Sequence, residues 1–267
     1  MAILYVAAEA AELKPFASLL TGLRKLKWPV DYAWEGILES RRILLAANGA
    51  GPKLAAQVVE IAVRAAMVAE LSSSRLEAVV STGFCGALDP ALREHQIVVV
   101  NEVRSPAGES FPCSPVQSQS EFVSGALLSS DSVANDSAAK SALFREGTIA
   151  VDMEAAGVAA RARKAGLPFA CIKVVSDRAD ESFPFDLNAM RTPEGRIARG
   201  KIVVHALGHP NTVPALFRLK RRADDAAKAL GEFLVASRVI AESGDGGARA
   251  SQRGEDGTTS AEETAAP

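Results

Sequence analysis

The sequence predicts an α/β protein built around a mostly parallel central sheet. Short apolar runs rich in β-branched residues alternate with longer segments of helical period, which is the order of βαβ units. The runs at 78–80 and 97–100 are almost continuously hydrophobic, as expected of strands buried on both faces. In addition, 267 residues with 48% apolar content can bury one large core, so one main domain is expected.

Six strands and three helices are expected from these periodicities. The strands are Ile3–Ala7, Ile43–Ala47, Ala78–Thr82, Ile97–Val103, Thr148–Met153 and Phe169–Ser176. The helices are Pro52–Leu71, Glu154–Ala165 and Val213–Ser237. Pro, Ser, Gly and Gln are frequent in the segment Pro106–Ser120, which is expected to be an irregular loop, either a lid over a binding site or a plain surface insertion.

The domain is expected to cover residues 1–240 and to be followed by a disordered tail at 241–267. From Glu242 onward the chain has no apolar periodicity, so burial cannot offset the entropy that ordering would cost. The amino terminus has no basic leader, and no apolar run reaches the roughly 20 residues that span a bilayer. We therefore expect a soluble cytoplasmic protein without stable membrane insertion.

Charge and cysteine content narrow the choice of partner. The formal net charge is −2 with scattered signs, which gives no basic face for nucleic acid and favours a small-molecule ligand. The three cysteines, Cys85, Cys113 and Cys171, lack metal-ligand spacing and are expected to be reduced thiols packed among apolar residues. Neither a metal site nor a cofactor motif is expected.

Two carboxylates stand where predicted strands end. Glu154 follows the run that ends in Val151-Asp152-Met153, and Asp177 follows the run that ends in Ser176. The carboxyl ends of parallel strands meet at one edge of a sheet, where ligands bind. Two glycine-containing segments, 48–52 and 81–88, are expected at the same edge. Neither has a nucleotide phosphate motif, so each is either a tight turn or a close approach to a ligand.

Taken in order, these segments resemble the nucleoside phosphorylase and nucleosidase superfamily, and within it the 5′-methylthioadenosine/S-adenosylhomocysteine nucleosidases. The resemblance rests on Glu12 after the first strand, Asn48-Gly49-Ala50-Gly51, the segment from Ser81 to Leu88, Val151-Asp152-Met153-Glu154 and Ser176-Asp177. It implies a single-domain three-layer nucleoside phosphorylase-like fold, with a central mixed, mostly parallel sheet flanked by helices. It also implies a homodimer that hydrolyses the N-ribosidic bond of a 5′-modified adenosine, releases adenine and uses no cofactor.

The resemblance implies a role for each matched residue. Asp177 would give a proton or hydrogen bond to the imidazole nitrogen of the purine, and Ser176 would orient Asp177. Glu154 would accept hydrogen bonds from the ribose hydroxyls, while Met153 would pack against the sugar. Glu12 would hold the nucleophilic water near the anomeric carbon. These groups would stabilise the positive sugar and the negative base of one transition state.

Two further residues of the site are implied by position alone. Gly83 lies in the second glycine segment, where the backbone would approach the ligand. Val133 stands where an aromatic residue stacks on the base in the methylthioadenosine enzymes. Glu9 and Lys173 also depart from that pattern, since an apolar residue and an arginine are usual there. The identity of the group at the ribose 5′ position therefore stays open.

Each acid also has a structural interpretation. Glu12 could be an exposed acid in the first turn of a helix, Asp177 a helix cap, and Glu154 an acid at a helix start. Asp152 is expected to support the site and not to take part in the chemistry.

Water is favoured over phosphate as the nucleophile. Phosphorylases of this superfamily commonly hold phosphate with an arginine ahead of the second glycine segment, and the stretch 79–83 is neutral here. Arg104 and Lys173 are the residues that could reverse this preference. The alternatives are a phosphate-dependent purine nucleoside phosphorylase and a nucleoside-binding protein without turnover.

The carboxyl-terminal region from Pro193 resembles hopanoid-associated members of the superfamily, thought to remove adenine from adenosylhopane. Such a substrate needs an apolar route beyond the ribose. Residues that could line it are Phe183, Phe185, Leu187, Met190, Leu216 and Phe217. The alternative is a longer helical cap packed on the core. The basic residues at 218–222 are expected on a solvated helix face, with contact to a membrane surface as the alternative.

Overall fold

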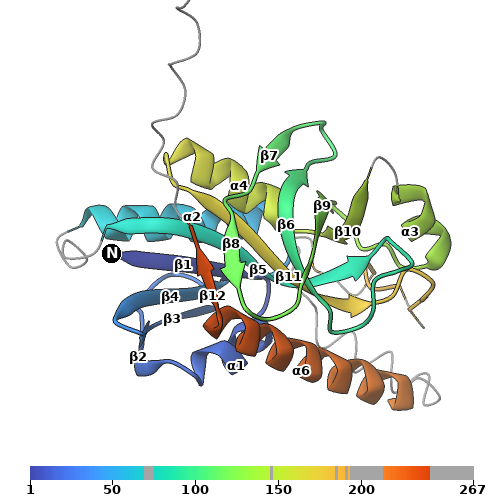
Figure 1. Ribbon diagram of the computed structural model, residues 1–267, viewed down its shortest axis with the longest axis horizontal. Coiled ribbons are helices and arrows are strands. Elements are labelled where there is room, and N and C mark those ends of the chain that lie inside the picture. Colours follow the sequence, from blue (N-terminus) through green and yellow to red (C-terminus); the bar gives the residue numbers. More distant parts are fainter. Residues whose placement is uncertain (69–74, 145–146, 184–185, 190–191, 193–212, 241–267) are drawn as a thin grey trace, which may run out of the picture.

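A ten-stranded mixed sheet forms the centre of the protein in the computed structural model (Figure 1). The structure describes residues 1–68, 75–144, 147–183, 186–189, 192 and 213–240. The strands of this sheet are β1 (Ala2–Ala7), β2 (Thr21–Lys25), β3 (Tyr32–Leu38), β4 (Arg41–Ala47), β5 (Leu76–Ala87), β6 (Ile97–Arg104), β7 (Ser110–Pro112), β9 (Val123–Ser129), β10 (Thr148–Asp152) and β11 (Phe169–Asp177). A separate two-stranded sheet pairs β8 (Val116–Ser118) with β12 (Ser237–Val239).

The strands of the large sheet follow the order β10-β9-β6-β11-β5-β1-β4-β3-β2, with β7 beside β6. Its central strands β4, β1, β5 and β11 are parallel, as expected from their continuous apolar runs. Antiparallel pairing joins β2 and β3 to this centre and joins β6 to β11. The predicted mixed α/β class is therefore confirmed, with antiparallel strands on both sides of a parallel centre.

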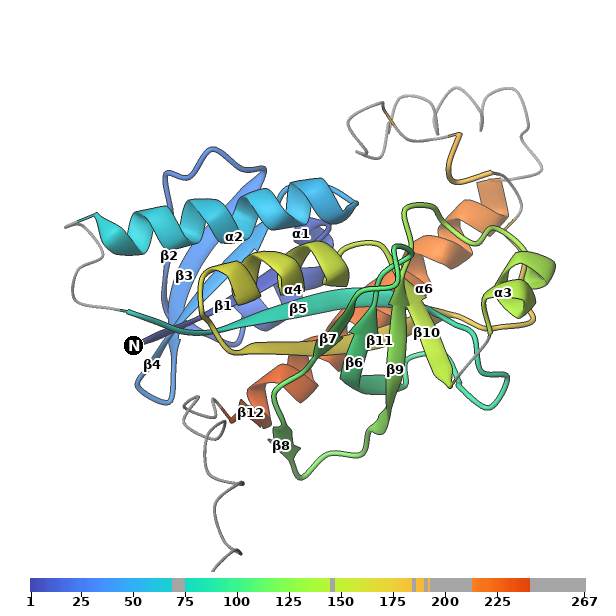
Figure 2. The same cartoon turned by 90° about the horizontal axis from the view of Figure 1, so that it is seen from above.

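Helices cover both faces of the sheet (Figures 1 and 2). The helices are α1 (Ala10–Ala17), α2 (Pro52–Met67), α3 (Ser137–Leu143), α4 (Ala155–Lys164) and α6 (Val213–Val235). Alternate residues of β1 pack into two hydrophobic cores on opposite faces of the sheet. Leu4 and Val6 pack into the core that contains residues of α2 and α4, whereas Ile3 and Tyr5 pack into the core that contains residues of α1 and α6. This alternation gives three layers, with the sheet in the middle.

All six predicted strands and all three predicted helices are present, with ends displaced by a few residues. The sequence analysis missed β2, β3, β9, β12, α1 and α3. The predicted irregular loop at Pro106–Ser120 is wrong in part, because β7 and β8 lie within it and pair with β6 and β12. None of its residues lines the cavity described below, so the structure does not support a lid.

Some predictions concern residues that the structure does not describe. The tail at 241–267, and with it the domain boundary at residue 240, remains a prediction. Phe185, Met190 and most of the region after Pro193 also lie outside the described residues. Within the described part, no helix is both long and apolar enough to cross a membrane. The three cysteines are free thiols, and Cys85 and Cys171 are buried as expected.

Candidate active site

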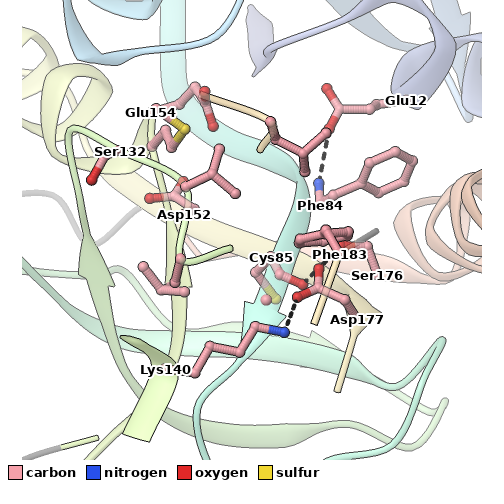
Figure 3. Close-up of a pocket in the computed structure, with 16 residues that line it drawn as sticks. Glu12, Phe84, Cys85, Ser132, Lys140, Asp152, Glu154, Ser176, Asp177 and Phe183 are labelled. Atoms are coloured by element: carbon pink, nitrogen blue, oxygen red, sulfur yellow. Dashed lines mark hydrogen bonds and ion pairs between the residues drawn. The ribbon is translucent and has the colours of Figure 1, made fainter. Parts of the chain in front are cut away.

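A cavity of about 240 Å³ lies at the carboxyl ends of β5, β10 and β11 (Figure 3). The resemblance implied seven site residues, and six of them line this cavity. They are Glu12, Val133, Met153, Glu154, Ser176 and Asp177. The seventh, Gly83, lies immediately behind Glu12. Within the described residues, no group of His, Cys, Asp and Glu side chains is arranged to hold a metal ion.

Glu12 is buried in the first turn of α1, so the interpretation as an exposed helix acid is wrong. Its Oε1 accepts a hydrogen bond from the Phe84 backbone N–H at 2.9 Å, and its Oε2 accepts one from the Glu9 N–H at 2.7 Å. Burial raises the pKa of Glu12, although these two hydrogen bonds oppose the shift. The carboxylate is thus fixed in position and able to take up a proton.

Gly83 makes the position of Glu12 possible. A Cβ atom at residue 83 would lie 2.7 Å from Glu12 Oε1, and the backbone φ of +112° disfavours any residue with a side chain. The segment 81–88 was predicted to be either a tight turn after a strand or a close approach of the backbone to a ligand. The turn is wrong, because residues 81–87 belong to β5 and Gly83 is an irregular position inside that strand.

We expect Gly83→Ala to lower both stability and turnover. Backbone strain at positive φ costs about 1–3 kcal/mol, and the new methyl group displaces Glu12 from the Phe84 N–H. Gly108→Ala is a matched control, since Gly108 also has positive φ (+82°) but a Cβ there meets no atom within 4 Å. Thermal unfolding and turnover of both variants are the measurements. Equal turnover in the two variants would show that Glu12 does not depend on Gly83.

Glu154 is held at the start of α4. Its Oε1 accepts a hydrogen bond from the Gly51 backbone N–H at 2.8 Å, which brings the first glycine segment to the cavity edge as expected. Gly157 permits this approach of α2 and α4, because a Cβ there would lie 2.1 Å from the Pro52 carbonyl oxygen. Burial, with the Asp152 charge adding to it, raises the pKa of Glu154 to about 7.

Asp152 and Lys173 form a buried ion pair beneath the cavity. Lys173 Nζ lies 2.8 Å from Asp152 Oδ2 and donates to the Thr82 carbonyl at 3.1 Å. Burial alone would lower the pKa of Lys173, but the Asp152 carboxylate outweighs it and holds the pKa above its usual value. Asp152 also accepts a hydrogen bond from the Ala155 N–H, so it satisfies the first backbone donor of α4. Both residues thus have structural partners.

Asp177 ends β11 and is buried at the other end of the cavity, away from Glu12 and Glu154 (Figure 3). Ser176 Oγ donates to its Oδ1 at 2.6 Å, and Lys140 Nζ lies 2.5 Å from its Oδ2. No helix starts directly after Asp177 in residues 178–183, so the helix-cap interpretation is wrong. Sequence reasoning missed Lys140, because nothing in the Ser- and Ala-rich segment around it indicates burial.

The remaining wall of the cavity is largely apolar. Val133 and Met153 line it, together with Phe84, Phe183 and Leu187. A reciprocal pair of hydrogen bonds between Val133 backbone groups and the Asn188 side chain fixes the Val133 loop.

Two of the residues suggested for a lipid route line the cavity, and two do not. Phe183 and Leu187 are lining residues, and the Phe183 ring lies 5.5 Å from Lys140 Nζ, hence at the Asp177 end. Leu216 and Phe217 are not lining residues, and Phe217 is 69% exposed on α6. The basic stretch 218–222 is only partly a solvated face, because Arg222 donates to the Ser176 carbonyl at 2.6 Å and pairs with Glu181.

Comparisons with known proteins agree with this architecture. A family model described as "Phosphorylase superfamily" matches residues 117–208. No curated protein sequence matches the chain. Over these residues the family model agrees with the resemblance to the nucleoside phosphorylase and nucleosidase superfamily.

Solved structures share the fold at low sequence identity. A 5′-methylthioadenosine/S-adenosylhomocysteine nucleosidase from S. pneumoniae has a TM-score of 0.62 and 18% identity, covering 88% of this chain and 97% of that chain. An S-adenosylhomocysteine nucleosidase from Streptococcus pyogenes has a TM-score of 0.64 and 18% identity, and the match covers 88% of this chain and 95% of that chain. Futalosine hydrolase of Helicobacter pylori has a TM-score of 0.61 and 17% identity, and the match covers 88% of this chain and 96% of that chain. The nucleoside phosphorylase-like fold is therefore confirmed.

Proposed function

We propose that this protein is a nucleosidase that hydrolyses the N-ribosidic bond of a 5′-modified adenosine and releases adenine. The observation that carries the proposal is the distribution of acids around one cavity. Glu12 and Glu154, each held by backbone N–H groups, lie toward one end, and Asp177 with its Ser176 hydrogen bond lies toward the other. Such a cavity can stabilise opposite charges at the two ends of a breaking bond.

Each acid suits one part of the reaction. As the C–N bond breaks, its electron pair moves to the base, and Asp177 supplies a proton to the imidazole nitrogen. Glu154 binds the ribose hydroxyls, and its negative charge stabilises the cationic sugar. Glu12 orients a water molecule toward the anomeric carbon and accepts the proton that this water loses. Ser176 keeps Asp177 in place through the 2.6 Å hydrogen bond.

Water, not phosphate, is the proposed nucleophile. Four acids line the cavity, and Lys140 is the one lysine or arginine among its lining residues in the described chain. The two cations that sequence analysis singled out lie elsewhere: Arg104 bonds to Glu102, and Lys173 bonds to Asp152. Among the described residues that line the cavity, a phosphate dianion beside Glu12 and Glu154 would meet acids and no arginine. Phosphorolysis therefore remains the less favoured alternative.

The group at the ribose 5′ carbon is proposed from the names of the structural neighbours, which include methylthioadenosine and adenosylhomocysteine. A polycyclic lipid group has less support, because Phe183 lies at the Asp177 end of the cavity and Phe217 lies outside it. A homodimer is also a proposal from the resemblance, and a cytoplasmic location is a proposal from the free cysteines.

The experiment is a base-release assay with a panel of nucleosides. Methylthioadenosine, S-adenosylhomocysteine, adenosine, inosine and a lipid–adenosine conjugate are incubated with the protein, and the free base is measured. We expect adenine from at least one 5′-modified adenosine, at a higher kcat/KM than for adenosine or inosine. Binding of these nucleosides without any base release would instead identify a nucleoside-binding protein.

A further inference from the structure

An irregularity in β11 lies directly before Asp177. In the pairing of β11 with β5, Val175 is paired with Cys85 and Asp177 with Gly86, so two steps along β11 correspond to one step along β5. Ser176 is therefore an extra residue in β11, which makes this irregularity a β-bulge. A bulge bends its strand and changes the direction of the side chains beside it, so the bulge contributes to the direction of Asp177.

The bulge takes the backbone of Ser176 out of the sheet ladder. Ser176 is paired with no residue of the two neighbouring strands, β5 and β6, both of which the structure describes in full. A backbone carbonyl that is removed from water needs another hydrogen-bond donor. The Nη2 of Arg222, on α6, supplies this donor at 2.6 Å from the Ser176 carbonyl oxygen.

The guanidinium of Arg222 is itself held by two carboxylates. Its Nη1 and Nη2 lie 2.6 and 2.7 Å from the two carboxylate oxygens of Glu181, and its Nε lies 3.4 Å from Glu94 Oε2. The planar fork of an arginine can bond a carboxylate through two nitrogens and a carbonyl oxygen at the same time, which a lysine cannot do. The donor to Ser176 therefore has a fixed orientation.

The helix that carries Arg222 is anchored in the core on the α1 side of the sheet. Residues four apart lie on the same face of a helix, and Arg222 is followed at this spacing by Ala226 and Leu230. Both residues are fully buried in the core that α6 shares with α1 and with one face of the sheet. Packing of α6 thus brings Arg222 to the carboxyl end of β11.

We propose that Arg222 is a positioning residue that holds the β-bulge at Ser176 and thereby directs the Asp177 carboxyl group toward the base of the substrate. The role of Asp177 in this proposal rests on the proposed nucleosidase function, whereas the contact between Arg222 and the bulge does not. Arg222 is not among the described residues that line the cavity, so it acts through Asp177 and not by touching the ligand.

The first test is the steady-state kinetics of Arg222→Met, with the best nucleoside of the panel as substrate. We expect kcat for adenine release to fall by about 10–100-fold, because a displacement of about 1 Å at a reacting group can cost about 10²-fold. We expect little change in KM, since the other walls of the cavity are kept. A kcat equal to that of wild type would overturn the proposal.

A double variant shows whether Arg222 acts through Asp177. If it does, the substitution has nothing left to misplace once Asp177 is replaced. We therefore expect the kcat of Arg222→Met/Asp177→Asn to stay within about twofold of that of Asp177→Asn. A general loss of folded structure would instead lower kcat by the same factor in both backgrounds. That outcome would contradict the proposal.

Arg161→Met is the matched control. Arg161 lies on α4 with its Nη2 3.3 Å from Glu60 Oε1, and its side chain is 26% exposed, close to the 23% of Arg222. We expect this variant to unfold at a lower temperature than wild type and to keep its kcat. An equal fall of kcat in Arg161→Met would show that loss of any such ion pair is enough, and would count against Arg222.

Arg222→Lys keeps the proposal testable if Arg222→Met does not fold. Lysine keeps a positive charge between Glu94 and Glu181, but its single nitrogen cannot bond Glu181 through two atoms and also reach Ser176. We therefore expect an unfolding temperature near that of wild type together with a reduced kcat. A kcat close to that of wild type in Arg222→Lys would show that the bond to Ser176 is not needed.

Hydrogen–deuterium exchange tests the contact without turnover and thus separates this proposal from the proposed function. We expect the backbone amides of residues 175–178 to exchange faster in Arg222→Met than in wild type, and at the wild-type rate in Arg161→Met. Unchanged exchange in Arg222→Met would overturn the proposal even if adenine is released. Faster exchange in a protein that cleaves no nucleoside would retain Arg222 as the support of the bulge and reject only the nucleosidase function.

Discussion

Asp177→Asn is expected to lower kcat for adenine release by about 10²–10⁴-fold while changing KM little. Asparagine has nearly the same shape but cannot transfer a carboxyl proton, and that proton matters mainly in the transition state. Steady-state kinetics on the best nucleoside of the panel give both constants. Turnover close to that of wild type would exclude Asp177 as the acid.

The charge of Lys140 requires a control for this substitution. Asp177→Asn leaves the ammonium of Lys140 buried without its counter-charge, which destabilises a protein by about 3–5 kcal/mol. The double variant Lys140→Met/Asp177→Asn removes both charges. We expect it to regain stability in thermal unfolding while its turnover stays low. Recovery of turnover together with stability would show that the single variant was only poorly folded.

Glu154→Gln is expected to impair both substrate binding and turnover. The proposed contacts to the ribose hydroxyls exist before the bond breaks, and the negative charge of Glu154 matters more as the sugar becomes cationic. Glutamine can still accept the Gly51 hydrogen bond, so the local backbone contact is kept. We therefore expect a higher KM and a lower kcat. An unchanged KM would contradict the assignment of Glu154 to the ribose.

Glu154→Gln is also expected to change how the stability of the protein depends on pH. The pKa of Glu154 is raised from an ordinary value of 4.5 to about 7, so between these values the folded protein binds more protons than the unfolded chain. The stability of wild type therefore falls as pH rises through this window. Glutamine removes this effect, and we expect the variant to gain up to about 3 kcal/mol relative to wild type between pH 4 and 8. A difference in unfolding temperature between wild type and Glu154→Gln that stays constant from pH 4 to pH 8 would argue against the raised pKa of Glu154.

The strands and the acids at their ends could be predicted because their signals are local. Buried parallel strands need apolar β-branched runs, and Glu154 and Asp177 follow two such runs directly. Strand β2 could not be predicted, since all five of its residues are exposed and its pairing with β3 leaves no apolar pattern.

The surroundings of the site could not be read from local signals. The burial of Glu12 depends on Gly83, which lies far along the chain and has positive φ inside a strand. Lys140 is buried because Asp177 and two backbone carbonyls after β11 surround its ammonium. Sequence periodicity reports which residues face a core, but it does not report which polar groups meet across two elements.

Adenine release in phosphate-free buffer is the most direct measurement of the central claim, that water cleaves the N-ribosidic bond in this cavity. With the preferred 5′-modified adenosine, we expect adenine and the free sugar at the same rate with and without added phosphate. Release of adenine only after phosphate is added, with a sugar 1-phosphate as the second product, would contradict the claim and identify a phosphorylase.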